Sequence, residues 1–87
     1  MDDRQHLLLA VGITEWASAL THLDVISNQG VIVPADVVRA IGRELAALIQ
    51  QWPAPLGTSV DKVIADARRY CTEHVTEMDT LLAETRT

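Results

Sequence analysis

Two interruptions rich in proline and glycine divide this 87-residue chain into three long segments. The first interruption runs from Gly30 to Pro34 and the second from Pro53 to Gly57. Proline removes a backbone donor and disfavours helical geometry in the residue before it, and glycine readily ends a helix. Each segment between the breaks is long enough for a helix of several turns, so the breaks predict helices joined by short loops.

Apolar residues recur at spacings of three and four in all three segments, as expected for helices that each bury one face. We predict helices over residues 3–29, 34–52 and 59–84. Helices of this length joined by short loops favour antiparallel neighbours. The sequence therefore predicts an all-α fold, a compact three-helix bundle with up-down-up topology, as a single domain over residues 1–87.

Local signals indicate where the helices begin and end. Asp2 suits the positive end of the first helix dipole, and Gly30 supplies a left-handed residue at the other end. Thr58 followed by Asp61 has the spacing of a capping box at the start of the third helix. The β-branched run at residues 31–33 has no second strand to pair with, so we expect an extended connector that covers one end of the core.

Composition and charge exclude several classes of function. The chain is 48% hydrophobic and 22% charged, as in a globular protein. Its net charge of −5 repels phosphate backbones, and two Trp, one Tyr and no Phe offer little base stacking. The residues Met1, Asp2 and Asp3 lack the positive charge with which a signal peptide starts, so we expect no leader. The sequence has no apolar stretch long enough to cross a bilayer and only one cysteine. We therefore expect a cytoplasmic protein that contacts neither nucleic acid nor a membrane directly.

The first predicted helix has unusually little charge. Between residues 5 and 30 only Glu15 and Asp24 are charged, and a second set of uncharged side chains projects away from the main apolar stripe. This set is covered internally if the first helix is central and touched on two sides by the others. We favour the alternative, a protein interface, because monomers rarely expose large apolar patches. The predicted interface comprises Leu7, Leu8, Val11, Ser18, His22, Val25 and Ile26.

Acidic residues concentrate near the carboxyl end, at Glu73, Glu77, Asp79 and Glu84. Such charge usually serves only to keep a protein soluble. As a functional alternative, the acidic surface would occupy the basic nucleic-acid-binding groove of a partner protein and inhibit it, a strategy of small proteins of mobile elements.

Reactive side chains are concentrated at Tyr70, Cys71, His74 and Glu77. Cys71 with His74 could share a zinc ion, and His74 with Glu77 could form half of a carboxylate-bridged site, but neither pair has further ligands nearby in the sequence. A catalytic cysteine needs an exposed, electropositive setting, whereas Cys71 lies in the middle of an apolar stripe. We therefore expect no enzyme, no metal and no cofactor, and keep this cluster only as a lesser alternative.

The leading hypothesis is a small acidic helical interaction module, an adaptor or regulator. It would act through the charge-poor face of the first helix. Its partner would be another protein or a second copy of the chain, in a homodimer.

Overall fold

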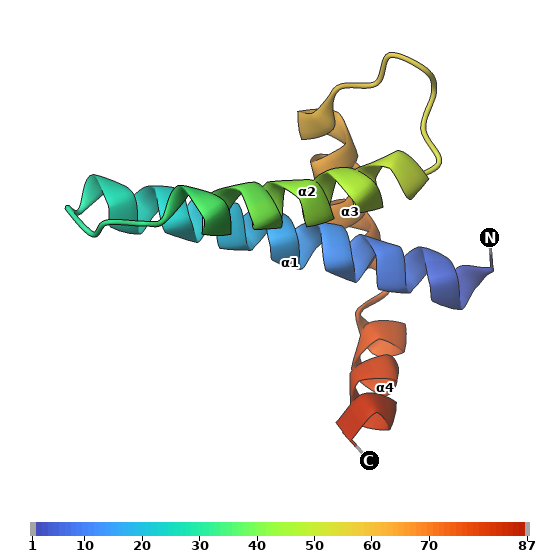
Figure 1. Ribbon diagram of the computed structural model, residues 1–87. Coiled ribbons are helices and arrows are strands. Elements are labelled where there is room, and N and C mark those ends of the chain that lie inside the picture. Colours follow the sequence, from blue (N-terminus) through green and yellow to red (C-terminus); the bar gives the residue numbers. More distant parts are fainter. Residues whose placement is uncertain (1, 87) are drawn as a thin grey trace.

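A computed structural model describes residues 2–86 of the chain, with side chains for residues 2–84. Over this range the chain forms four helices and no strand (Figure 1). The predicted all-α fold is therefore confirmed. The helices are α1 (Asp3–Asn28), α2 (Ala35–Gln51), α3 (Val60–Glu73) and α4 (Val75–Arg86).

The helices α1 and α2 form an antiparallel hairpin whose bounds match the sequence prediction to within one residue at each end. At the start of α1, the Asp2 carboxylate accepts a hydrogen bond from the Gln5 backbone N–H at 2.7 Å, and the Gln5 side chain accepts one from the Asp2 N–H. Beyond its end, Gly30 has φ 92°, a conformation that favours glycine. Capping groups at both ends thus define the helix.

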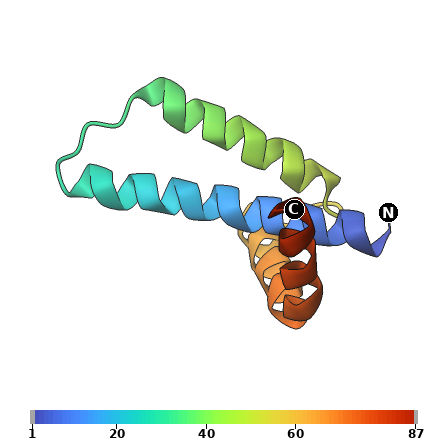
Figure 2. The same cartoon turned by 90° about the horizontal axis from the view of Figure 1, so that it is seen from below.

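The connector between α1 and α2 does not cover the core as the sequence predicts. Residues 31–33 form neither helix nor strand, but Ile32 is 93% exposed and Val31 is also exposed. The tip of the hairpin lies far from α3, so these side chains have no third helix to pack against (Figures 1 and 2).

The predicted single helix over residues 59–84 is interrupted at His74. In a continuous helix the His74 backbone N–H would donate to the Tyr70 carbonyl. Instead the His74 N–H donates to the Cys71 carbonyl at 3.2 Å, and the Nδ1 of the His74 ring binds the Tyr70 carbonyl at 2.8 Å. Because a side-chain donor replaces the backbone donor, α3 ends at Glu73 and α4 starts in a new direction (Figure 2).

The cap of α3 is Ser59 and not Thr58. The Ser59 hydroxyl accepts a hydrogen bond from the Lys62 backbone N–H at 3.2 Å. The Thr58 hydroxyl instead donates to the Pro55 carbonyl at 2.6 Å, which stabilises the loop before the helix.

The third helix crosses α1 on the side opposite α2, so α1 lies between them (Figures 1 and 2). The molecule measures 40 × 37 × 19 Å, and its radius of gyration is 14.3 Å. A compact chain of this length would have a radius of gyration of about 12 Å. The predicted compact up-down-up bundle is therefore matched only in part, because the first two helices are antiparallel but the third does not lie along both.

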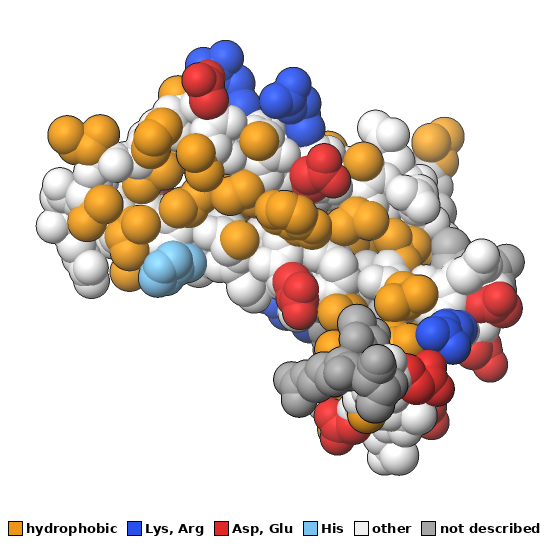
Figure 3. Space-filling view, turned by 60° about the horizontal axis from the view of Figure 1, so that its bottom comes forward, with side chains coloured by type: hydrophobic (Ala, Val, Ile, Leu, Met, Phe, Trp, Pro, Cys, Tyr) orange, Lys and Arg blue, Asp and Glu red, His pale blue; other side chains and the backbone are white. Residues whose placement is uncertain are grey.

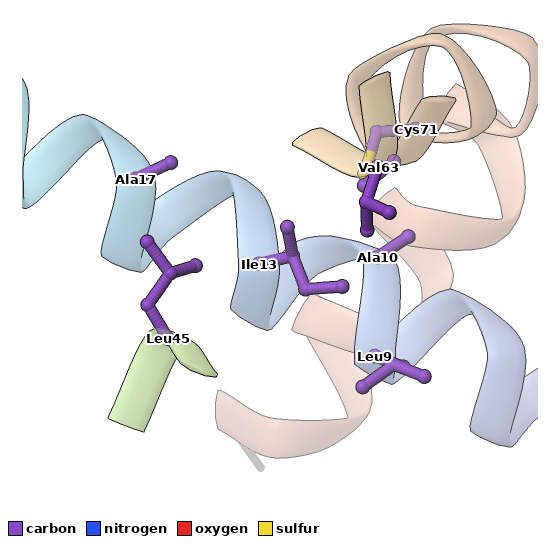
Figure 4. Packing of buried hydrophobic residues seen from close by; sticks show 8 residues of the cluster. Leu9, Ala10, Ile13, Ala17, Leu45, Val63 and Cys71 are labelled. Atoms are coloured by element: carbon purple, nitrogen blue, oxygen red, sulfur yellow. The ribbon is translucent and has the colours of Figure 1, made fainter. Parts of the chain in front are cut away.

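The hydrophobic core lies where α1 meets both of its neighbours (Figure 4). Ala10 of α1 and Ala67 of α3 are both fully buried, and such small residues allow the two helices to approach closely. On the α2 side, a Cβ at Gly12 would lie 3.1 Å from Leu48 Cδ1, so glycine permits this approach. The buried cluster comprises Leu9, Ala10, Ile13, Ala17, Leu45, Val63, Ala67 and Cys71.

The distal half of the hairpin contains no buried residue. Beyond Ala17, every residue of α1 is half-buried or exposed, and Leu45 is the one buried residue of α2. The hairpin between these two positions is therefore held by contacts of two helices alone.

We predict that Ile13→Val lowers the free energy of unfolding by about 1 kcal/mol, because it removes a buried methylene from the crossing point. The same substitution at the exposed Ile32 should change it by less than about 0.5 kcal/mol. Urea unfolding followed by circular dichroism at a fixed protein concentration measures both. Equal effects at the two positions would contradict this location of the core.

Candidate functional site

Hydrophobic side chains form a nearly continuous band along the seam between α1 and α2 (Figure 3). Leu8 of α1 lies one turn before Gly12, the residue that approaches α2. It lies on the opposite side of the helix from Ala10, which faces α3. Residues at helical spacing continue this solvent-facing side along α1 and α2. We call the following exposed or half-buried residues the apolar band: Leu8, Ala19 and Ile26 of α1, and Val37, Ile41 and Leu48 of α2.

The apolar band is open to solvent and contains no charged residue. Leu8 is 49% exposed and Val37 is 43% exposed. Acidic side chains stand at both edges of the band (Figure 3), where helical spacing places Glu15 of α1 and Glu44 of α2. The surface therefore has an apolar centre and a charged rim.

Of the seven predicted interface residues, only Leu8 and Ile26 belong to the apolar band. Leu7 is only 5% exposed and lines a cleft together with the buried Leu81 of α4, so it does not belong to an open surface. The other four are exposed or half-buried residues of α1 that lie outside the band: Val11, Ser18, His22 and Val25.

Sequence reasoning missed the contribution of α2 to this surface. Its apolar stripe has the spacing of an ordinary core face, and nothing in the sequence separates Leu45, which is buried, from Val37, which is not. Whether the stripe of α2 is buried depends on how many helices pack against it, and the apolar spacing alone does not give that number.

A cluster of four rings lies near the crossing of α1 and α3. The Tyr70 ring stacks between His6, at a centroid distance of 4.2 Å, and His74, at 3.9 Å. Trp52 meets His6 edge-on at 4.7 Å. Sequence reasoning missed this cluster, because His6 and Trp52 are distant from Tyr70 in the sequence and only the tertiary fold brings them together.

An open cleft of about 390 Å³ lies beside this cluster, between the start of α1 and α4. Burial raises the pKa of Tyr70, and the nearby Asp3, Glu77 and Cys71 raise it further. The phenol is therefore neutral near pH 7, which suits a hydrogen-bond donor and not a nucleophile. The cleft is lined by Asp3, Arg4, Leu7, Tyr70, His74, Glu77, Thr80, Leu81 and Glu84.

The predicted reactive cluster is divided between the cleft and the core. Tyr70, His74 and Glu77 line the cleft, whereas Cys71 is buried against α1 with its Sγ 3.8 Å from the Thr14 Oγ1. The thiol and the histidine thus do not share an open site. Within the described part of the chain, no three His, Cys, Asp or Glu side chains are grouped closely enough to hold a metal ion.

The four acidic residues of the predicted acidic surface are spread over different sides of the molecule. Glu73, at the end of α3, lines a separate cleft of about 220 Å³. Glu77 and Glu84 line the larger cleft, where Glu84 forms an ion pair with Arg4 at 3.2 Å. Helical spacing places Asp79 on the other side of α4 from Glu77.

No protein family, curated protein or solved structure matches this chain. Among the helices of residues 2–86, none combines the length and the apolar character that crossing a bilayer requires. The two candidate sites, the apolar band and the cleft, are therefore judged from their geometry.

We predict that Glu77→Gln lowers the pKa of Tyr70 toward 10.0, because it removes a negative charge that disfavours the phenolate. Tyr70 is the only tyrosine, so an ultraviolet titration of phenolate absorbance reports it directly. Asp79→Asn removes the same charge from the other side of α4 and should have a smaller effect. Equal shifts would mean that Glu77 acts only through the net charge.

The raised pKa of Tyr70 also predicts a loss of stability at alkaline pH. In the unfolded chain the phenol ionises near pH 10.0, whereas in the folded chain it stays protonated to higher pH. Its contribution to stability is therefore complete below about pH 10 and is lost as the pH rises through the folded pKa. Urea unfolding over an alkaline pH series should show a shallower decline in Tyr70→Phe than in the unmodified chain.

Proposed function

We propose that this chain is a small, non-enzymatic protein-interaction module, an adaptor or regulator, that binds through the apolar band. One observation carries the proposal: hydrophobic side chains of α1 and α2, each exposed or half-buried, lie side by side along the hairpin (Figure 3). Soluble monomers rarely leave contiguous apolar surface of this kind in water.

The charge distribution around the band supports this proposal. The centres of protein interfaces are depleted of charged residues, and their rims are polar. The apolar band has the same organisation, with Glu15 and Glu44 at its edges and exposed to solvent. An apolar helical surface on a partner would fit along the seam between the two helices.

The incomplete packing of the hairpin supports it as well. Between Ala17 and Leu45 the hairpin has no buried residue of its own, although residues such as Leu23 and Ile41 are half-buried. Each square ångström of apolar surface removed from water contributes about 25 cal/mol. A partner on the band would supply the missing side of this core.

The cleft beside Tyr70 offers a weaker site. Both faces of the Tyr70 ring are already covered by His6 and His74, so a ligand could not stack on it.

We place the interaction in the cytoplasm, a setting in which the single thiol of Cys71 stays reduced.

We predict that Leu8→Arg and Val37→Arg abolish partner binding, because each places a charge in the apolar centre of the interface. The matched controls are Leu56→Arg, at a fully exposed loop position, and Val60→Arg, which like Val37 lies in the first turn of a helix. Affinity capture from a cell lysate, with helix content checked by circular dichroism, should recover the same proteins with the unmodified chain and both controls. Recovery of those proteins by the band variants as well would exclude the band as the interface.

A further inference from the structure

We propose that the occupant of the apolar band is a second copy of this chain, and that two hairpins pack face to face into a four-helix core. This inference rests on the proposed function, because it assigns a partner to the same surface. In such an assembly each copy uses the same patch, so the interface is closed by twofold symmetry.

The exposed area of one copy supports a partner of this size. The chain exposes 6186 Å². A compact monomer of 9.5 kDa would expose roughly 5,000 Å², so the surplus is about 1,000 Å². A standard interface removes about 800 Å² from each partner. One copy therefore exposes about as much extra surface as its share of a stable dimer would cover.

The shape of the hairpin supports a helical partner with the same dimensions. The 17 residues of α2, which lie alongside α1, extend about 26 Å, and two adjacent helices present a face about 18 Å wide. The product, about 460 Å², is a little over half of the share of one partner in a standard interface. The occupant must itself present a long, flat, apolar helical face, and the apolar band of a second copy is such a face.

The distribution of charge permits two copies to approach. The net charge of −5 opposes self-association in general, but little of it lies in the distal hairpin. Residues 18–44 have a net charge of −1, and most acidic groups lie outside this range. A strongly basic partner would instead require a row of acidic side chains along the band, where only Glu15 and Glu44 stand. The charged residues between 18 and 44 are Asp24, Asp36, Arg39, Arg43 and Glu44.

Sedimentation equilibrium over a concentration series, at low and high salt, tests the proposal. The unmodified chain should form a dimer that persists at high salt, because apolar contact is not screened. Leu8→Arg and Val37→Arg should raise the dissociation constant at least about 30-fold, as expected for an unpaired charge in an interface. Leu56→Arg and Val60→Arg should leave it unchanged.

Hydroxyl-radical footprinting of the unmodified chain gives a test that does not depend on the folding of any variant. As the protein concentration rises, Leu8 and Val37 should become protected, whereas Leu56 should remain reactive. Protection that is absent at every concentration would overturn the second copy as the occupant.

The two proposals fail in different ways. A chain that stays monomeric, but captures another protein that the band variants lose, would overturn the second copy and leave the proposed function standing. A dimer that survives Leu8→Arg and Val37→Arg would overturn the location of the interface on the band. If capture were also unaffected by these variants, both proposals would be wrong.

Discussion

The packing of α1 against two partners at once is the constraint on which the rest of the structure depends. One helix can pack closely against two neighbours only if its side chains are small where the helices cross. Ala10 meets this requirement toward α3, and Gly12 meets it toward α2, where an added Cβ would lie 3.1 Å from Leu48. Because α2 and α3 lie on different sides of α1, they share little contact of their own. The core is consequently confined to the crossing (Figure 4).

This confinement divides the molecule into parts with different energetics. Near the crossing, Ile13 is fully enclosed and the packing resembles the interior of a larger protein. In the distal hairpin only two helices meet, and a pair of helices without a third layer covers only one side of each apolar stripe. At the other end, α4 is anchored by the buried Leu81 and by the ion pair of Glu84 with Arg4. The exposed apolar surface thus follows directly from the position of the crossing.

The sequence predicts the helices better than their arrangement, for identifiable physical reasons. The apolar spacing and the helix-ending residue Gly30 predict the bounds of α1 and α2 to within one residue, because these signals are local. The break at His74 has no proline or glycine beside it and depends on a side chain that takes over the Tyr70 carbonyl. The stacking of His6 on Tyr70 depends on the crossing angle, which no local pattern specifies. Local chemistry is visible in the sequence, whereas contacts between distant segments are not.

The same distinction explains why the candidate surface was only half visible. The low charge of α1 is a property of composition, and it leaves open whether other helices or a partner cover the second set of uncharged side chains. In the structure both α2 and α3 pack against α1. The stripe of α2 gives no indication of an uncovered surface, since Val37 and Ile41 occupy positions that a core residue would occupy in any bundle. Whether a stripe is covered depends on how many helices reach it. Here α3 crosses α1 near its amino-terminal half. The apolar side chains of the distal hairpin therefore have no third helix to cover them. In the dimer that we propose, a second hairpin of the same shape would cover this surface on both copies at once.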